Sequence, residues 1–217
     1  MMIIRSRHDP VEAFTRVELL LIISSVVALG ILWCSHYSSD KAKSRLIYCN
    51  NNLKQVGLAF KTWSPDQSDV FPMRRPASSG GTLELTNSSL VFRTFLVLSN
   101  ELIEPALLIC PEDSRKPATN FGAEFSSNNV SYFVGLDASE EDPESLLSGD
   151  RNITNGIPLN NGLLLLPTNF PAGWNQQFHN GIGNVSLGDG SVQILRSTRL
   201  WQQFCAAGTA TNRLMMP

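Results

Sequence analysis

Apolar residues are arranged along the first third of the chain in two ways. From Leu19 to Cys34 they form a run that contains no charged residue. Further on, they recur at intervals of three and four residues, which places them on one face of a helix. These positions are Leu46, Cys49, Leu53, Val56, Phe60 and Trp63. Because the stripe lasts less than three heptads, packing on a domain core is favoured over a two-stranded coiled coil.

Both segments belong to one predicted helix. No proline interrupts this region until Pro65, which ends the pattern. We expect a helix from about Phe14 to Trp63, which would be ~75 Å long at ~1.5 Å per residue. Its first half, residues 14–36, is expected to lie in a membrane. Its second half, residues 37–63, is expected to pack on a globular domain formed by residues 64–217.

The rest of the chain mixes loop, strand and helix signals. Residues 64–88 are rich in Ser, Pro and Gly and predict a loop. The apolar segment Leu90–Leu98 is too short for its periodicity to separate a helix from a strand. Ala106–Cys110 (ALLIC) predicts a buried strand that the following proline ends. Asn129–Leu136 (NVSYFVGL) alternates well enough to predict another strand.

The stretch FHNGIGNVSLGDGSVQILR, which ends at Arg196, predicts a β-hairpin. Asn184–Leu187 and Ser191–Leu195 are the expected strands, and Gly188–Gly190 is the expected turn. An Asp-Gly pair favours such a turn strongly because both central positions adopt positive φ.

The uncharged apolar run is short for a membrane span. Its residues make about 24 Å of helix, whereas a hydrocarbon core of ~30 Å needs ~20 residues. A full span must therefore include Phe14–Glu18, which places Arg16 and Glu18 at the membrane edge. A charge at the bilayer centre costs roughly 2.5–3.5 kcal/mol, and less at the interface. Glu18 is thus tolerated there, but it requires an explanation.

Four kinds of membrane segment compete for this region. A cleavable signal peptide needs an A-x-A-like site, which the following sequence LWCSHYSSDKA lacks. A lipoprotein signal needs a small residue before the lipidated cysteine, whereas Trp33 precedes Cys34. A plain signal anchor and a type IV prepilin signal are the two that fit.

The stretch AFTRVELLLI resembles the processing site of type IV prepilins and type II secretion pseudopilins, which usually is G-F-T-L-[IV]-E-L. The resemblance implies that a prepilin peptidase cuts between Ala13 and Phe14 and methylates the new amino terminus. Ala13 replaces the usual Gly, and Arg16 replaces an apolar residue. Glu18 becomes the fifth residue of the mature chain.

The chemistry of Glu18 agrees with this resemblance. The amine of Phe14 and the carboxylate of Glu18 lie four residues apart, on one face of a helix. In the family, this glutamate of an incoming subunit pairs with the terminal amine of a neighbour. A charge in a medium of low dielectric constant is costly unless it is paired. An ordinary interfacial charge on a signal anchor is the alternative.

Three further stretches resemble a group of prepilin-type proteins, the DUF1559 group. They are CNNNLKQVGLAF at Cys49–Phe60, LLICPED at Leu107–Asp113, and an H-x9-DG element formed by His179, Asp189 and Gly190. Together they cover most of the chain. The resemblance implies an α+β, pilin-like fold in which a long N-terminal helix packs against an antiparallel β-sheet.

No catalytic arrangement accompanies His179 and Asp189. Ser186 and Ser191 lie in predicted strands, and nothing resembles a G-x-S-x-G nucleophile. Since His179 is the only histidine beyond His36, a multi-His metal site is excluded. We expect a structural contact between His179 and the hairpin, with a calcium or partner site near Asp189 as the alternative, and we do not expect an enzyme.

An acidic stretch, DASEEDPES at residues 137–145, offers oxygen atoms to Ca²⁺. Some pseudopilins bind calcium through acidic loops, but the spacing here is not that of an EF-hand. A solvated loop is therefore favoured. We expect no metal and no cofactor, with calcium as the alternative.

The four cysteines contain no CxxC pair, which argues against a zinc site or a thioredoxin-like motif. Cys49 lies on the apolar stripe and Cys110 ends a predicted buried strand, so helix packing on the sheet would bring them near each other. A disulfide between them is one hypothesis, and two separate buried thiols are the other. Cys34 and Cys205 are not obvious partners.

Composition and charge limit the function further. The 217 residues carry a net charge of −2, so nothing indicates a nucleic-acid partner. Arginines and lysines are balanced across the apolar run, so the positive-inside rule gives no orientation. The resemblance implies a bacterial inner-membrane protein with a single span and a periplasmic domain. Its expected partners are prepilin peptidase, other pilin or pseudopilin subunits and the inner-membrane assembly platform. A signal-anchored periplasmic binding or interaction domain that does not assemble is the alternative.

Overall fold

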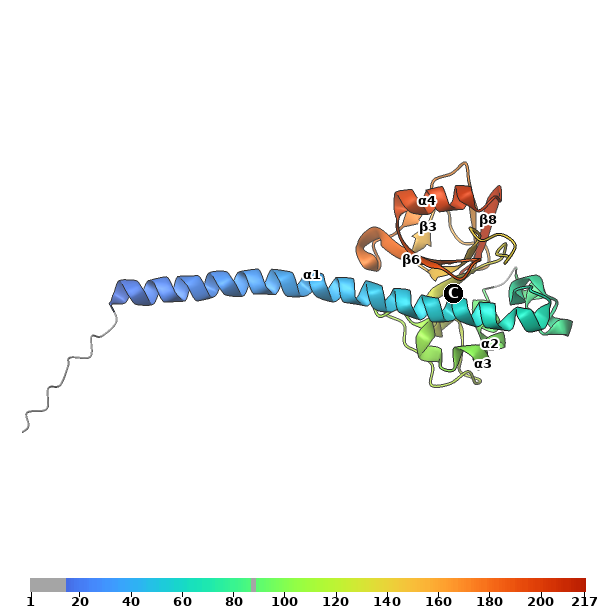
Figure 1. Ribbon diagram of the computed structural model, residues 1–217, viewed down its shortest axis with the longest axis horizontal. Helices are drawn as coiled ribbons and strands as arrows, with labels where there is room; N and C mark the ends of the chain where they lie inside the picture. Colours follow the sequence, from blue (N-terminus) through green and yellow to red (C-terminus); the bar gives the residue numbers. More distant parts are fainter. Residues whose placement is uncertain (1–14, 87–88) are drawn as a thin grey trace, which may run out of the picture. The chain divides into compact units, whose positions relative to one another are not determined.

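The long helix α1 runs from Arg16 to Trp63 in the computed structural model (Figure 1). It ends where predicted, and Pro65 opens the short 3₁₀ turn that follows. The structure describes residues 15–86 and 89–217, so the expected first helical residue, Phe14, lies outside the described part. Two compact units divide the chain, one up to Lys41 and the other from Ala42 to Pro217.

The first unit contains the apolar half of α1. Residues Arg16–Trp33 form a window of 18 residues with a mean hydropathy of 2.0, and none of it is buried within the structure. By length and composition, this helix can cross a membrane. The side chains that would face lipid, such as Leu20 and Ile31, are exposed.

The second unit is built on a six-stranded antiparallel sheet with the order β4-β8-β1-β2-β6-β7. A separate pair, β3 and β5, forms a small antiparallel sheet. The strands are β1 (Tyr132–Gly135), β2 (Leu146–Asp150), β3 (Ile153–Thr154), β4 (Leu163–Pro167), β5 (Gly173–Trp174), β6 (Ile182–Leu187), β7 (Val192–Arg196) and β8 (Thr211–Met215). The α+β class with an antiparallel sheet is thus confirmed.

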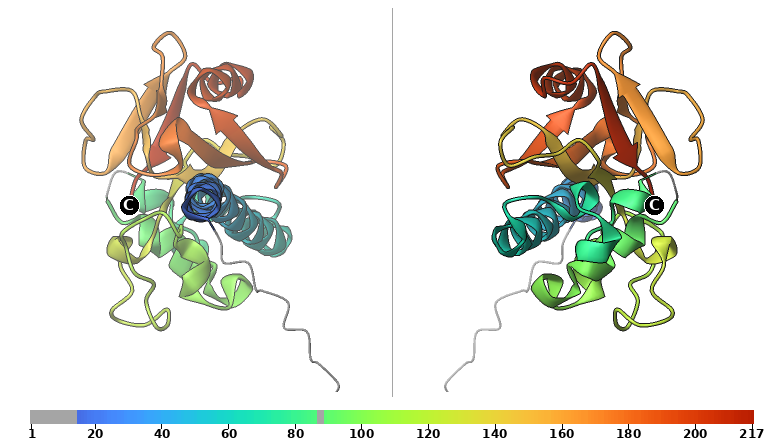
Figure 2. Two further views of the ribbon diagram at one scale, coloured as in Figure 1. Left: turned by 90° about the vertical axis from the view of Figure 1, so that its left-hand side faces the viewer. Right: turned by 90° about the vertical axis from the view of Figure 1, so that its right-hand side faces the viewer.

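Helices cover both faces of the six-stranded sheet. In Figure 2 the domain part of α1 lies against one face and α4 (Ser197–Ala206) against the other. Alternate residues of β1 therefore enter different cores. Tyr132 and Val134 belong to the core shared with α1, whereas Phe133 belongs to the core on the side of α4.

The apolar stripe of α1 is the main contribution of the helix to the first core. Five of its six positions are buried, and Leu46, nearest the start of the domain, is half-buried. The buried positions are Cys49, Leu53, Val56, Phe60 and Trp63. Phe60 packs edge to face on Phe71 and Phe95, with ring centroids 5.8 and 6.3 Å away.

One glycine allows α1 to approach the sheet closely. A Cβ atom on Gly57 would lie 2.6 Å from Ser186 Oγ in β6 and 3.4 Å from the carbonyl oxygen of Gly190. A larger residue at this position would push the helix off the hairpin. The low helix propensity of glycine is therefore offset here by the contact that it permits.

Several other predictions are settled by the structure. Leu90–Leu98 contains a helix, α2 (Val91–Val97), and β1 lies within the strand predicted at residues 129–136. The predicted strand at Ala106–Cys110 is wrong, because Pro105–Leu108 forms a 3₁₀ turn, η5. A proline at the first position of such a turn has its φ already fixed and needs no N–H donor, so it favours the turn over a strand.

Short helices fill the connections. They are α3 (Ser99–Leu102) and the 3₁₀ turns η1 (Pro65–Gln67), η2 (Pro72–Arg74), η3 (Ala77–Ser79), η4 (Leu83–Leu85), η6 (Ser127–Asn129) and η7 (His179–Gly181). Four of these turns lie in the predicted loop 64–88, which is therefore ordered over its described residues.

Two leucines of α1 test the packing of the helix on the sheet. Leu53 is 0% exposed and Leu58 is 63% exposed. We expect Leu53→Ala to lower the free energy of unfolding by about 2–5 kcal/mol, because it leaves a cavity in the core. The matched control Leu58→Ala should change it by less than about 0.5 kcal/mol. Denaturant unfolding of the full chain in detergent, followed by tryptophan fluorescence, measures both. Equal effects of the two substitutions would contradict this packing.

Candidate functional site

Four ionisable side chains converge in the core between α1 and the sheet. They are Cys49 of α1, Cys110 after η5, Asp150 at the end of β2 and His179 at the start of η7. All four residues are buried, and their sulfur, carboxylate oxygen and imidazole nitrogen atoms lie within 4.8 Å of one another. We call this group the quartet.

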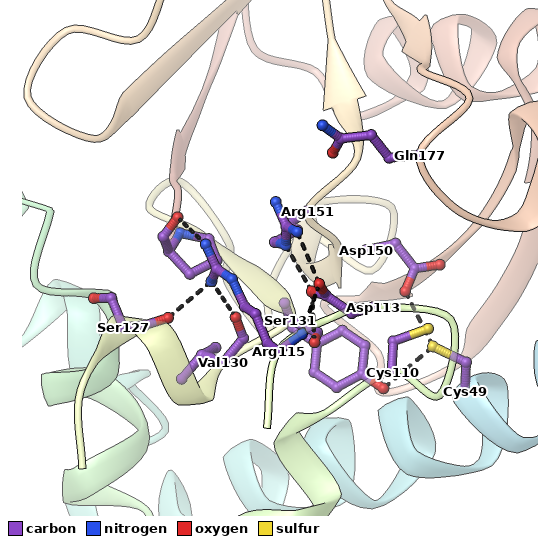
Figure 3. A network of polar contacts seen from close by, with 12 residues as sticks. Cys49, Cys110, Asp113, Arg115, Ser127, Val130, Ser131, Asp150, Arg151 and Gln177 are labelled. Carbon is purple, nitrogen blue, oxygen red and sulfur yellow. Dashed lines mark hydrogen bonds and ion pairs between the residues drawn. The ribbon is translucent and has the colours of Figure 1, made fainter. Parts of the chain in front are cut away.

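The quartet is connected by direct polar contacts. The Sγ of Cys110 lies 3.0 Å from Nε2 of His179. The thiol of Cys49 donates to Oδ1 of Asp150 at 3.2 Å, and Nε2 of His179 lies 3.9 Å from Oδ2 of the same carboxylate. Figure 3 shows the side chains of Cys49, Cys110 and Asp150 pointing toward one another.

Strand pairing positions Asp150 and its polar neighbours. Tyr132 of β1 is the cross-strand partner of Asp150, and its hydroxyl lies 3.3 Å from Sγ of Cys49. Asn184 of β6 donates its backbone N–H and its side-chain amide to Oδ2 of Asp150, at 2.7 and 2.9 Å. Asn50 of α1 in turn donates to Oδ1 of Asn184 at 3.3 Å. Polar side chains of β1 and β6 therefore contact the quartet directly, and Asn50 of α1 supports one of them.

An ion pair holds the segment that carries Cys110. Asp113 accepts from Nε and Nη2 of Arg151 at 2.6 and 2.8 Å, and from the hydroxyl of Ser131 at 2.9 Å (Figure 3). Arg151 directly follows Asp150, and its guanidinium carbon lies 5.4 Å from the ring centroid of Phe178. This one arginine thus links the segments that carry Cys110, Asp150 and His179.

A second arginine fixes the same segment from its other side. Arg115 donates to the carbonyl oxygen atoms of Ser127, Val130 and the C-terminal Pro217 (Figure 3). The loop that follows Cys110 is thereby tied to the entrance of β1 and to the end of the chain.

The backbone at His179 has an uncommon conformation. His179 and Asn180 have φ angles of 59° and 49°, in the left-handed region that side chains other than glycine seldom adopt. Such a residue costs about 1–3 kcal/mol, and it persists only where the surrounding structure requires it. The turn directs the imidazole into the core, where its Nδ1 is buried without a hydrogen-bond partner in the described structure.

The four groups change one another's ionisation. Burial raises the pKa of Asp150 and of Cys49. The close approach of Cys49, aided by His179, lowers the pKa of Cys110 to about 7. Burial alone would lower the pKa of His179, but its contacts with Cys110 and Asp150 outweigh this effect and raise it. Negative charge on Cys110 is therefore stabilised by the adjacent imidazole.

The cysteine pair and the histidine of the sequence analysis thus meet in one place. Cys49 and Cys110 are both free thiols here, so the disulfide between them stays a prediction. Cys205 is a free, exposed cysteine far from them in sequence.

The two halves of the H-x9-DG element are separated by a strand. His179 precedes β6, whereas Asp189 and Gly190 form the turn after it, so the nine-residue spacing corresponds to one crossing of the sheet. The hairpin itself is confirmed. Asp189 is exposed and accepts from the N–H of Ser191 at 2.8 Å, and Gly190 has a φ of 86°. The imidazole has its polar contacts with the quartet rather than with this turn.

Glu18 has a defined local structure at the start of α1. Its Oε2 accepts from both the N–H and the hydroxyl of Thr15, each at 2.8 Å. The N–H of Glu18 in turn donates to Oγ1 of Thr15 at 3.3 Å. This is a capping box, which the T-x-x-E spacing signals in the sequence. Ala13 and Phe14 lie outside the described residues.

Carboxylates of the acidic stretch 137–145 have separate partners. Asp137 pairs with Arg213, Glu140 with Lys61 and Ser64, and Glu144 accepts from Gln203. Within the described residues, the carboxylates of this stretch do not form a metal-ligating group.

Asp150 has no motif around it that predicts a site, and the quartet lacks the close ligand spacing by which zinc motifs are found in a sequence. Cys49 and Asp150 are 101 residues apart, and Cys110 and His179 are 69 apart. No local motif joins such distant residues. The quartet is buried, and the surface cavity of 410 Å³ lined by Ser68, Glu140 and their neighbours contains no quartet residue.

Comparison with known proteins assigns no family or function to this chain. No family model matches the chain, and neither a curated protein nor a solved structure shows significant similarity to it.

The ion pair beside the quartet should contribute to stability. Asp113→Asn leaves Arg151 without its carboxylate, so we expect the free energy of unfolding at neutral pH to fall by roughly 2–4 kcal/mol. Asp137→Asn breaks the more exposed pair with Arg213 and should cost less than about 1 kcal/mol. Denaturant unfolding of the full chain in detergent measures both. A smaller loss of unfolding free energy for Asp113→Asn than for Asp137→Asn would contradict the stabilising role of the Asp113–Arg151 pair.

The same pair should make stability depend on pH. Burial alone would raise the pKa of Asp113, but the hydrogen bonds from Arg151 and Ser131 outweigh this and hold it below its ordinary value of 3.8. The contribution of the Asp113 carboxylate to the free energy of unfolding is therefore complete above its ordinary pKa. This contribution is lost as the pH falls through the lower pKa of the folded state. We expect the stability of Asp113→Asn to fall less steeply than that of the wild-type chain between about pH 5 and pH 2. Parallel curves of unfolding free energy against pH for the two chains would contradict this expectation.

Proposed function

We propose that this chain is a prepilin-like subunit that assembles through its N-terminal helix into a type IV pilus or a type II secretion pseudopilus. Prepilin peptidase would cut it between Ala13 and Phe14. Until assembly, the subunit would be held in the bacterial inner membrane by a single span, with its domain in the periplasm. The assembly platform of that membrane and other subunits would be its partners.

The position of Glu18 carries this proposal. Glu18 lies in the first turn of a helix whose window Arg16–Trp33 is apolar enough to cross a membrane. Counted from the proposed cut, it is the fifth residue, one helical turn from the new amine of Phe14. A carboxylate at this depth is stabilised when an amine of a neighbouring subunit neutralises it.

The architecture also supports a structural subunit. The same helix continues into the second unit, where its apolar stripe packs on an antiparallel sheet. This combination of an apolar half and a packed half agrees with the pilin-like fold that the sequence resemblance implies.

One observation favours a second candidate, a signal-anchored periplasmic interaction domain that does not assemble. The capping box between Thr15 and Glu18 gives the carboxylate a function in an uncleaved anchor, because it satisfies backbone N–H groups at the start of the helix. The two candidates differ in processing and in the need for the charge of Glu18.

Processing is tested by the mature N-terminus. We expect that co-expression with the cognate prepilin peptidase gives a chain that begins with N-methylated Phe14. Mass spectrometry of the N-terminal peptide measures this, and a chain expressed without the peptidase is the control. An intact leader, or a cut far from Ala13, would exclude the prepilin assignment and favour the anchored domain.

The charge of Glu18 is tested separately from its capping. Glutamine can replace glutamate in a capping box but carries no charge. We expect both Glu18→Gln and Glu18→Ala to be cleaved normally and to enter filaments at least about tenfold less than the wild-type chain, which corresponds to a loss of ~1.4 kcal/mol. Glu141→Gln, in the acidic stretch of the domain, is the matched control. Wild-type incorporation of Glu18→Gln, measured in sheared filament fractions, would leave Glu18 with a capping role alone.

A further inference from the structure

We propose that the quartet of Cys49, Cys110, Asp150 and His179 binds one Zn²⁺ ion, which joins α1 to the sheet. The site would be structural, and it is independent of whether the chain assembles into a filament.

The donor set is one that suits zinc. Two sulfur atoms, one imidazole nitrogen and one carboxylate oxygen provide four ligands of the types that Zn²⁺ prefers. Calcium and magnesium require six or more oxygen ligands, which this group does not provide. Thiolate and imidazole ligands in a group of four also favour zinc over the harder divalent ions.

The distances agree with tetrahedral coordination. Zn–S bonds of ~2.3 Å and Zn–N or Zn–O bonds of ~2.0–2.2 Å place the ligand atoms of a tetrahedral site roughly 3.3–3.8 Å apart. In the structure, two contacts between proposed ligand atoms are 3.0 Å (Cys110 Sγ to His179 Nε2) and 3.2 Å (Cys49 Sγ to Asp150 Oδ1), and no two ligand atoms are more than 4.8 Å apart. Movements of about 1 Å or less would therefore complete the site.

Burial makes this a closed site. Cys49, Cys110 and Asp150 are 0% exposed, and the side chain of His179 is 1% exposed. Structural zinc sites have four protein ligands, whereas catalytic sites keep one position open to water. The quartet supplies all four ligands itself, so the metal would stabilise the fold and would not activate a water molecule.

Neighbouring residues are placed to support the ligands. The hydroxyl of Tyr132 lies beside Sγ of Cys49, and the two donors of Asn184 hold Oδ2 of Asp150, which leaves Oδ1 directed toward the thiol. Outer contacts of this kind orient metal ligands and stabilise their negative charge. The position of His179 is set by its left-handed backbone conformation and by the contact of the preceding Phe178 with Arg151.

A divalent cation also accounts for the buried charge. Asp150 is fully buried, and within the described part of the chain its one ion-pair partner is His179, at 3.9 Å. Buried carboxylates are normally paired or coordinated to a metal. On binding, each thiol would release its proton to the solvent, and His179 would coordinate as neutral imidazole, so the ion would be held by two thiolates and one carboxylate.

The first test is metal content. The full chain, purified in detergent with a mild reductant from cells supplied with zinc, should contain about one zinc per chain by elemental analysis. Cys49→Ser, Cys110→Ser and His179→Gln should each lower this at least tenfold. Cys205→Ser, which removes the exposed cysteine, should retain the metal. Zinc retained by all three quartet variants would overturn the proposal.

A second test avoids variants that fail to fold. The wild-type chain, stripped of metal by a chelator, should unfold at a lower temperature, and Zn²⁺ but not Ca²⁺ or Mg²⁺ should restore the original value. Co²⁺ bound in place of zinc should give intense visible bands and a thiolate charge-transfer band in the near ultraviolet. Either of two findings would overturn the proposal: a reduced wild-type chain that neither binds nor responds to zinc, or a freshly isolated chain with a Cys49–Cys110 disulfide.

Discussion

The contact between the apolar stripe of α1 and the antiparallel sheet is the interaction on which the domain depends. It buries Leu53, Val56 and Phe60 in the core shared with the sheet, and Gly57 allows the helix to come within reach of β6. At the end of the stripe nearer the apolar half of α1, Cys49 contacts Asp150 at the end of β2, and the adjacent Asn50 contacts Asn184 of β6. The helix therefore supplies both a hydrophobic contact and the first member of the quartet.

The parts of the fold that could be predicted are those with a local, repeated signal. The stripe of α1 has helical spacing, Pro65 marks its end, and the Asp189–Gly190 pair specifies the hairpin turn. The segment 106–110 has no such repeat. Its apolar residues fit a buried strand or a buried turn equally well. Pro105 favours the turn, because its φ is already fixed for the first position of a 3₁₀ turn.

The candidate site could be predicted only in part. Burial of Cys49 and Cys110 suggested that they lie close together, which the structure shows, but their chemistry depends on Asp150 and His179. Asp150 ends a buried strand and meets Cys49 across 101 residues of sequence, and the direction of the His179 side chain depends on a left-handed backbone conformation. Such information lies in strand pairing and in loop geometry, which a single sequence does not contain.

The wide separation of the quartet along the chain has a consequence for folding kinetics. Contacts between residues 69 and 101 positions apart require large loops to close, which is entropically costly and slow. The quartet can form only after α1, β2 and the segment before β6 have reached their native places. Any cross-link made there, whether by a metal or by oxidation, would act late in folding, and it would slow unfolding more than it accelerates folding.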